Sequence, residues 1–223
     1  MTRGSPFVPT LTPLGDRAVR VGFEAGDAAS DVVTAWCARL SDREIPGVEE
    51  WVPSMTAVAV FYDPLVIGFA ALCALLRGVI APEELRDAPA ARRVVLPVRY
   101  GGVDGPDLGL VARHAGMTEA EVIRRHCAGI YRVTMIGFTP GFPYLSGLDP
   151  ALATPRLDTP RPRVPAGSVG IGGEQTGVYP MESPGGWRLI GRTAARLFDP
   201  HRIPVSLLSP GDGVRFVPAE GGP

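Results

Sequence analysis

The chain has 223 residues, of which 45% are apolar, a content typical of globular proteins that bury a core. Its formal net charge of -1 and its pI near 6.3 argue against nucleic acid or an anionic membrane surface as a partner. All 22 basic residues are arginines, which excludes lysine chemistry.

Cysteine spacing and apolar runs predict the class and location of the protein. Cys37, Cys73 and Cys127 lie far apart and are odd in number, which predicts neither a disulfide framework nor a zinc site. The opening MTRGSPFVPTLTP interrupts each apolar run with proline and so lacks a secretory h-region. The longest apolar stretch, 65–76, is shorter than the roughly 20 residues that span a bilayer. We expect a cytoplasmic protein with no membrane segment, no metal and no covalently bound cofactor.

The first part of the chain alternates between strand and helix patterns. Apolar residues at helical spacing follow Ser30, which is placed to cap that helix, and a second apolar run ends at Gly78. Period-two and β-branched patterns predict the strands. The predicted elements in chain order are strand 17–23, a helix from Ser30, strands 48–53 and 57–62, helix 66–76 and strand 93–99. This β-α-β-β-α-β order predicts a ferredoxin-like split βαβ domain, which we assign to residues 1–92.

The second part of the chain changes in character. Short helices are predicted over 107–126, where Thr118 and Glu121 have the spacing of a capping box. Residues 129–191 then hold twelve glycines and nine prolines, too many for helices to dominate. Short apolar pieces predict strands at 131–136, 168–171, 187–190 and 214–217. The whole chain is therefore predicted to be α+β, with connecting helices and a closed β-barrel over residues 93–223.

The segment GFTPGFPY, residues 137–144, combines rigid turns with aromatic side chains and predicts one wall of a binding cleft. The alternative is a tight corner whose aromatic rings, Phe138 and Phe142, fill the barrel. Tyr144 ranks above them as a ligand contact, because a buried hydroxyl needs a hydrogen-bond partner.

Residues 165–179 are rich in small side chains that can leave backbone amides free to hold a carboxylate or phosphate. A series of strands and turns is the alternative, and the absence of lysine excludes a Walker A loop. Ser168, Gln175, Thr176 and Tyr179 are the uncharged hydrogen-bonding groups expected around an amide or lactam.

A third segment, 183–193, places Ser183, Gly185 and Gly186 beside Trp187, which permits close approach to the backbone. Arg192 follows and can clamp a carboxylate or orient a phosphoryl group, with a structural ion pair as the alternative.

His126 is the histidine next to this block and a candidate acid or base, or else a cap for the end of its helix. The chain contains no GxSxG, no HExxH and no close carboxylate pair in the glycine-rich block. We therefore expect an incomplete catalytic set that a partner completes.

Three segments, GFTPGFPYLSGL, PRPRVPAGSVGIGGEQTGVYP and ESPGGWRLIGRT, resemble the KipI/allophanate-hydrolase-subunit-1 family. The resemblance extends to GDRAVRVGF, PVRYGGVDGPDLGLVARHAGMT and the terminal GDGVRFVP, so it covers nearly the whole chain. The family is similar to the last part of the urea carboxylase carboxyltransferase domain. The resemblance implies a small N-terminal α/β domain and a cyclophilin-like C-terminal barrel.

The same resemblance implies a subunit of an ATP-dependent complex, with magnesium, that hydrolyses 5-oxo-L-proline to L-glutamate. An allophanate-hydrolase-subunit-2-type large subunit and a LamB/YcsF-type third component are the expected partners. Arg192 and His126 are then the catalytic candidates, and the expected substrate contacts are Tyr144, Ser168, Gln175, Thr176, Tyr179, Ser183, Gly185, Gly186 and Trp187. A protein inhibitor of a histidine kinase and half of a urea or amide carboxyltransferase are the alternatives.

Overall fold

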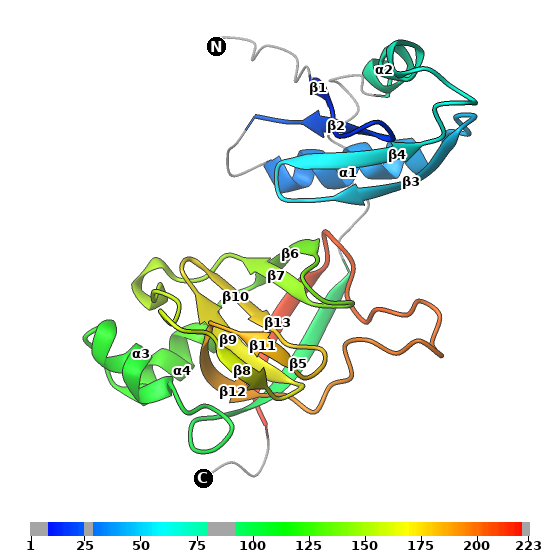
Figure 1. The fold of residues 1–223 in the computed structure, drawn as a ribbon. Helices are drawn as coiled ribbons and strands as arrows, with labels where there is room; N and C mark the ends of the chain where they lie inside the picture. Colours follow the sequence, from blue (N-terminus) through cyan, green and yellow to red (C-terminus); the bar gives the residue numbers. More distant parts are fainter. Residues whose placement is uncertain (1–8, 25–28, 80–91, 220–223) are drawn as a thin grey trace. The chain divides into compact units, whose positions relative to one another are not determined.

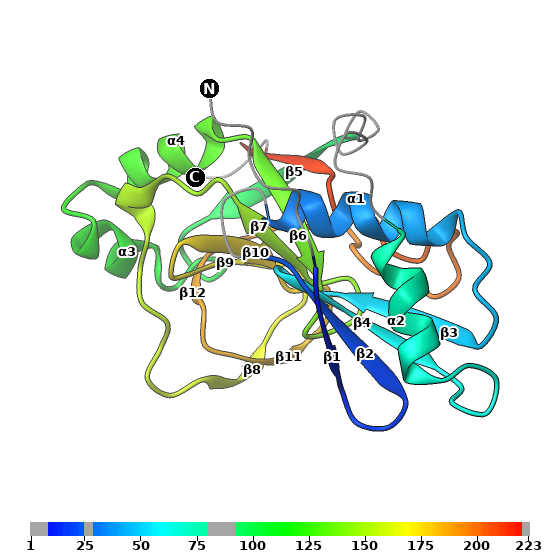
Figure 2. The ribbon, with the colours of Figure 1, turned by 90° about the horizontal axis from the view of Figure 1, so that it is seen from above.

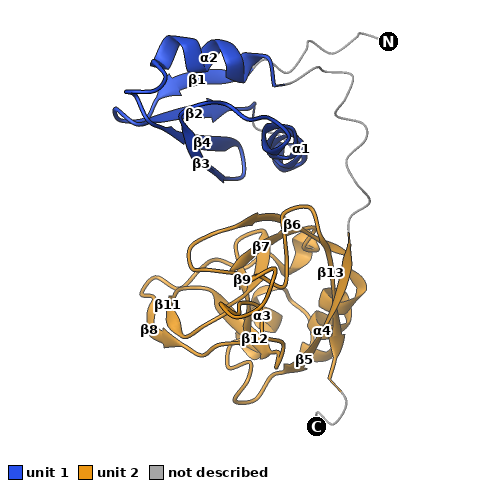
Figure 3. Cartoon of the chain, turned by 90° about the vertical axis from the view of Figure 1, so that its right-hand side faces the viewer, with its two compact units in different colours: residues 1–90 blue, residues 91–223 orange. Residues whose placement is uncertain are grey.

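The computed structural model describes residues 9–24, 29–79 and 92–219. The chain divides into two compact units, residues 1–90 and residues 91–223 (Figure 3). Each unit has a hydrophobic core of its own.

The first unit is an antiparallel sheet with two helices (Figure 1). Its strand order is β1-β2-β4-β3, with bounds β1 Thr10–Pro13, β2 Ala18–Gly22, β3 Val48–Pro53 and β4 Ala57–Tyr62. The helices are α1 Ala29–Ser41 and α2 Phe69–Arg77, which can be followed in Figure 2. Both helices share one core with the central strands, because alternate residues of β2 and β4 are buried with Trp36 and Leu72.

The predicted ferredoxin-like arrangement is not confirmed in full. Strands 48–53 and 57–62 have the predicted bounds, and both helices are present, but the predicted strand 93–99 does not complete this sheet. That segment is β5 (Arg93–Tyr100), which pairs with strands of the second unit. The edge beside β2 is formed by β1, whose largely exposed side chains show no alternation that predicts a strand.

The second unit is a closed barrel with the strand order β10-β7-β6-β13-β5-β12-β9. Strands β5 and β13 run parallel and every other pair in the barrel is antiparallel. The remaining bounds are β6 Tyr131–Ile136, β7 Pro143–Ser146, β9 Ser168–Gly172, β10 Gln175–Val178, β12 Arg188–Arg192 and β13 Gly213–Pro218. Buried aliphatic side chains and Phe216 fill the interior, which agrees with the predicted closed barrel.

Two helices, α3 Leu108–His114 and α4 Glu119–Ala128, pack on this barrel where connecting helices were predicted. Thr118 caps α4, because its hydroxyl accepts a hydrogen bond from the backbone amide of Glu121 at 3.2 Å. The predicted capping box is only half formed, since the Glu121 carboxylate binds arginines instead.

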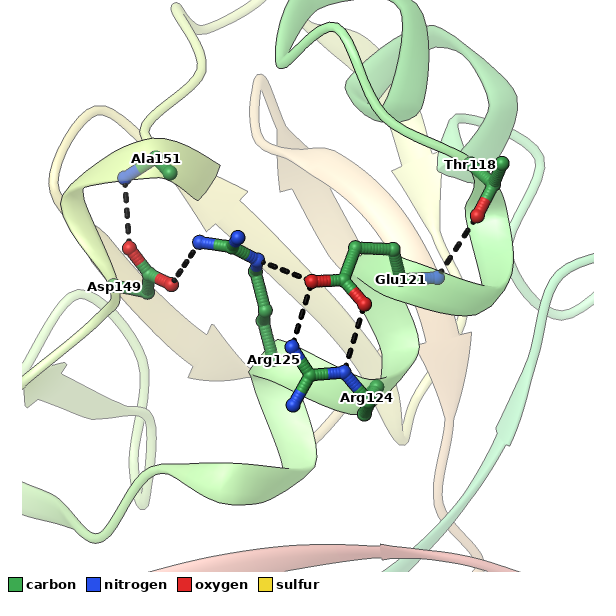
Figure 4. Close-up of polar contacts among 6 residues, drawn as sticks. All are labelled: Thr118, Glu121, Arg124, Arg125, Asp149 and Ala151. Atoms are coloured by element: carbon green, nitrogen blue, oxygen red, sulfur yellow. Dashed lines mark hydrogen bonds and ion pairs between the residues drawn. The ribbon is translucent and has the colours of Figure 1, made fainter.

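A chain of charges fastens α4 to the short helix η2 Pro150–Leu152 (Figure 4). The Glu121 carboxylate accepts hydrogen bonds from Arg124 and Arg125 at 2.7 Å. Arg125 also donates to Asp149 at 3.0 Å, and Asp149 caps the first turn of η2. The two arginines lower the pKa of Glu121 to about 2, because they stabilise its charged form. These charges thereby join α4 to the start of η2.

A separate two-stranded ribbon, β8 Arg161–Val164 with β11 Ser183–Gly185, completes the second unit. Beside it lies a small second core that contains Phe142, Tyr179 and Trp187. This core carries most of the aromatic residues singled out in the sequence.

Candidate functional site

A pocket of about 180 Å³ opens beside this second core. It is lined by residues from several separate segments of the chain: Phe138, Phe142, Tyr144, Arg156, Leu157, Pro160, Tyr179, Gly185, Gly186 and Trp187. Five of the nine predicted substrate contacts are in this set, so the structure brings residues 144, 179 and 185–187 together. We call this cavity the aromatic pocket.

The walls of the aromatic pocket are rings that meet edge to face. The ring centroid of Phe142 lies 5.1 Å from that of Tyr179 and 5.4 Å from that of Trp187. Tyr144 packs against Trp187 at 5.8 Å in the same way. Such pairs are favourable beyond the area they bury, because the positive edge of one ring meets the negative face of the next. The rings therefore support one another and form a rigid apolar wall.

Strand glycines make room for the Trp187 indole. A Cβ added to Gly172 would lie 2.5 to 2.7 Å from atoms of the indole, and one added to Gly177 would lie 2.9 Å from it. Both distances are shorter than real Cβ atoms show, so a side chain at either position would force the ring or the strand to shift. The glycine-rich segment 165–179 thus forms strands β9 and β10, as the strand alternative predicted, and its glycines accommodate a ring.

The aromatic pocket also holds one cation that the sequence analysis missed. The guanidinium carbon of Arg156 lies 5.6 Å from the centroid of the Trp187 ring, within cation–π range. Arg156 is exposed and forms no ion pair with any residue that the structure describes. It sits in a proline-flanked loop between η2 and β8 with no motif around it, so no sequence signal points to it.

Both tyrosines of the aromatic pocket are hydrogen-bond donors at neutral pH. Burial raises the pKa of Tyr144 and the pKa of Tyr179, because the phenolate is poorly solvated there. The backbone of Trp187 forms a hydrogen bond with the Tyr179 hydroxyl, which partly offsets this effect on the pKa of Tyr179. The arrangement can therefore offer two neutral O–H groups, one cation and apolar ring faces to a small ligand.

Four other predicted contacts line neither this pocket nor the cleft described below. Ser168 and Thr176 are buried in barrel strands, and Gln175 begins β10 opposite Gly172. Ser183 begins β11, and its hydroxyl is buried without a hydrogen-bond partner among the described residues. Their positions follow from the strand pairing, which the spacing of the motif does not predict.

His126 lies inside the barrel and lines neither pocket nor cleft. Its Nδ1 is 2.8 Å from the Tyr100 hydroxyl and its Nε2 is 3.0 Å from the Thr176 hydroxyl. Because the Thr176 hydroxyl already donates to the Gly170 carbonyl, it must accept from Nε2–H, and Nδ1 then accepts from Tyr100. Desolvation lowers the pKa of His126 to about 3, which keeps the ring neutral.

Arg192 lies at the far end of β12 from the aromatic pocket. It lines a cleft of about 780 Å³ together with Arg99, Glu182 and Arg196. Trp187 directly precedes β12 and Arg192 ends it, five residue steps further along the chain, which corresponds to roughly 16 Å at the usual rise. The structure therefore places the predicted catalytic arginine apart from the predicted substrate contacts. We call this second cavity the arginine cleft.

None of the helices in residues 9–24, 29–79 and 92–219 is long and apolar enough to cross a membrane. In the same residues, no group of three or more His, Cys, Asp and Glu side chains is placed to hold a metal ion.

Comparison with known protein families defines the class of protein. A family model described as carboxyltransferase domain, subdomain C and D, matches residues 9–208, so the chain belongs to this family. The chain is 45% identical over 212 residues to a 5-oxoprolinase subunit of Escherichia coli O157:H7, which covers 94% of this chain and 95% of that relative. The resemblance inferred from the sequence motifs is confirmed.

Solved structures of other proteins share the fold of this chain. The structure of TTHA0988 matches with a TM-score of 0.81 and 41% identity, over 92% of this chain and 40% of that chain. This chain therefore spans less than half of TTHA0988. Urea carboxylase of Kluyveromyces lactis matches with a TM-score of 0.72 at 21% identity, over 95% of this chain and 22% of that chain, and shares the fold.

Proposed function

We propose that this chain is a non-autonomous subunit of a cytoplasmic, ATP-dependent 5-oxoprolinase complex, and that its aromatic pocket holds the five-membered lactam. The Escherichia coli relative that is named as a 5-oxoprolinase subunit, matched over nearly its whole length, supports the choice of reaction. The observation that carries the proposal for the site is the meeting of Tyr144, Tyr179, Trp187 and Arg156 around one small cavity.

The dimensions and chemistry of the aromatic pocket suit 5-oxoproline. A volume of about 180 Å³ is below the roughly 300 Å³ at which drug-sized sites begin. The lactam ring packs against the Trp187 and Phe142 faces, and its carboxylate pairs with the exposed Arg156 guanidinium. The tyrosine hydroxyls, kept protonated by burial, donate to the lactam carbonyl.

The lining of the aromatic pocket supports the proposal that a partner completes the site. It contains no carboxylate, imidazole or thiol, so it offers no general base and no nucleophile other than two protonated phenols. In our proposal this chain binds and orients the lactam. The groups that this lining lacks come from a large subunit of the allophanate-hydrolase-subunit-2 type and a LamB/YcsF-type component, and ATP activates the lactam carbonyl in the assembled complex.

Reconstitution tests the proposal. ATP-dependent release of glutamate from 5-oxoproline is measured for this chain alone, with the large subunit, and with all three components. We expect activity only in the full mixture, and at least about a tenfold loss with Arg156→Ala, equivalent to roughly 1.4 kcal/mol. Arg17→Ala is the control, because Arg17 is an exposed arginine paired with Glu49 and lines neither this pocket nor the arginine cleft.

Two outcomes would contradict this proposal. A complex that assembles from folded subunits but does not cleave 5-oxoproline would exclude the reaction. Full activity with both Arg156→Ala and Trp187→Ala would exclude the aromatic pocket as the lactam site while leaving the reaction in place.

The family match favours one other candidate, half of a urea or amide carboxyltransferase. In that case the aromatic pocket would hold an acyclic amide, and the transferred group would come from carboxybiotin on another protein. Transfer of carbon-14 from carboxybiotin to urea by the assembled subunits, with no glutamate released from 5-oxoproline, would favour this candidate.

A further inference from the structure

Two arginines lie directly opposite each other on neighbouring barrel strands. Arg192 of β12 pairs in register with Arg99 of β5, and no residue separates them across the ladder. Like charges in this position destabilise a sheet unless other charges compensate. The pair therefore requires negative charge nearby to offset the repulsion between the two guanidiniums.

The protein supplies one carboxylate for these two arginines. Arg99 donates through Nε to Asp104 at 2.8 Å, and both arginines lower the pKa of Asp104, the hydrogen bond from Arg99 being the largest cause. Arg192 donates through its Nε to the carbonyl of Ala166 at 2.8 Å. Its two terminal nitrogens form no hydrogen bond with any residue that the structure describes. The backbone thus orients Arg192, and its two terminal nitrogens can donate hydrogen bonds to a ligand.

The remaining charges of the arginine cleft are balanced. Arg196 pairs with Asp199 at 3.0 Å, and Glu182 pairs with Arg163 at 2.6 Å. Among the charged residues that line the cleft, Arg192 is therefore the one that forms no direct ion pair in the described part of the chain, since Asp104, the nearby carboxylate, pairs with Arg99.

The floor of the arginine cleft is formed by two backbone segments that lie close to each other. Gly167 has φ +82, and a Cβ there would clash with the carbonyl of Thr193, so the two loops meet only because this residue is glycine. Small residues line this floor, whereas Met181, Phe198 and Pro200 give the cleft an apolar side. A concave surface with three guanidiniums and an adjoining apolar wall results.

We propose that the arginine cleft binds the phosphate chain of an oligophosphate anion, such as that of a nucleoside triphosphate. Guanidinium forks match phosphate oxygens, and a chain of phosphates offers several charged groups to the arginines that line the cleft. A single carboxylate would engage Arg192 alone and leave most of the 780 Å³ empty. This oligophosphate site is independent of the lactam site, because the aromatic pocket lies at the other end of β12.

Calorimetry on the full chain tests this inference with inorganic tripolyphosphate, ATP, orthophosphate and glutamate at constant ionic strength. We expect tripolyphosphate and ATP to bind and glutamate not to bind. Arg192→Ala should weaken tripolyphosphate binding at least about tenfold. Arg188→Ala removes the same charge from the opposite end of the same strand and should leave the affinity within about twofold.

A gain of affinity gives the sharpest test, because a misfolded variant cannot produce it. Asp104→Asn removes the carboxylate that competes for Arg99 and Arg192, so tripolyphosphate should bind severalfold more tightly. No binding of tripolyphosphate to the folded chain at millimolar concentration would overturn the inference. Equal affinities of the wild type, Arg192→Ala and Asp104→Asn, or equal binding of glutamate and tripolyphosphate, would overturn it as well.

Discussion

The backbone amide of Thr139 donates to the carbonyl of Gly137 at 2.8 Å, and Phe138 between them has φ +66. A three-residue turn with positive φ at its centre is rare and strained, and for a bulky aromatic residue it is an outlier. The Phe138 ring is 59% exposed and lines the aromatic pocket. Strain of this kind persists where the surrounding structure enforces it, and it is concentrated at functional sites.

Two substitutions separate the strained backbone from the ring. Phe138→Ala removes the ring and keeps the strain, whereas Phe138→Gly removes both. Because glycine adopts positive φ freely but loses more entropy on folding, we expect Phe138→Gly to be more stable than Phe138→Ala by about 0.5–1 kcal/mol. Urea unfolding measures this difference. Both variants should bind 5-oxoproline more weakly than the wild type, as followed by the fluorescence of Trp187.

These results can contradict the two parts of this interpretation separately. Equal stabilities of the alanine and glycine variants would show that the turn is not strained. Unchanged binding of 5-oxoproline in both variants would show that the Phe138 ring is not part of the ligand site, without affecting the proposed reaction.

Gly172→Ala should damage the aromatic pocket although residue 172 does not line it. The added Cβ would lie 2.5 to 2.7 Å from the Trp187 indole, so the ring must move or the strand must bend. We expect a loss of about 1–3 kcal/mol in stability and a weaker response of Trp187 fluorescence to 5-oxoproline. Gly173→Ala is the neighbouring control for packing, because its Cβ would meet nothing within 4 Å, although its φ of +67 carries a backbone cost. A Gly172→Ala protein with wild-type stability and binding would show that the strand glycines do not position Trp187.

Much of the fold follows from local patterns in the sequence. Strands 48–53, 57–62 and 131–136 were predicted with the bounds that the structure has, because their β-branched and aromatic residues alternate or cluster between turns. Strands β7, β8 and β11 were missed, since they begin with or contain proline and are only three or four residues long. The prediction that strand 93–99 completes the β-α-β-β-α-β order was wrong, because local pattern does not reveal which sheet a strand joins.

The candidate site was predictable in part for a similar reason. Tyr144 and Tyr179 were predicted because a buried hydroxyl needs a hydrogen-bond partner, and Trp187 because paired glycines stand beside it. Their separation from Arg192 was not predictable, since only the course of β12 shows that Trp187 directly precedes the strand and Arg192 ends it. Arg156 was missed because it reaches Trp187 from a loop with no motif of its own.

The N-cap of α4 gives a prediction about stability alone. Thr118 accepts the amide of Glu121, so Thr118→Ala leaves a helix donor unsatisfied and should cost about 1 kcal/mol of unfolding free energy. Thr118→Ser keeps the acceptor and serves as the matched control. Urea unfolding followed by Trp187, the tryptophan of residues 91–223, measures both variants. If the alanine and serine variants were equally stable, the cap would contribute nothing.

His126 makes the second unit sensitive to pH. Burial holds its folded-state pKa at about 3, below the roughly 6.5 of an unfolded histidine, so the unfolded chain takes up the proton first as pH falls. The contribution of neutral His126 to stability is therefore complete above about pH 6.5 and declines below it. From about pH 7.5 to about pH 5.5 we expect the unfolding free energy to drop by about 1.4 kcal/mol, before most carboxylates titrate. His126→Gln should remove this dependence, whereas His201→Gln, at an exposed histidine, should retain it. If the unfolding free energy of the wild type were the same at both pH values, the His126 ring would be accessible to protons in the folded barrel. His126 would then again be a candidate acid or base.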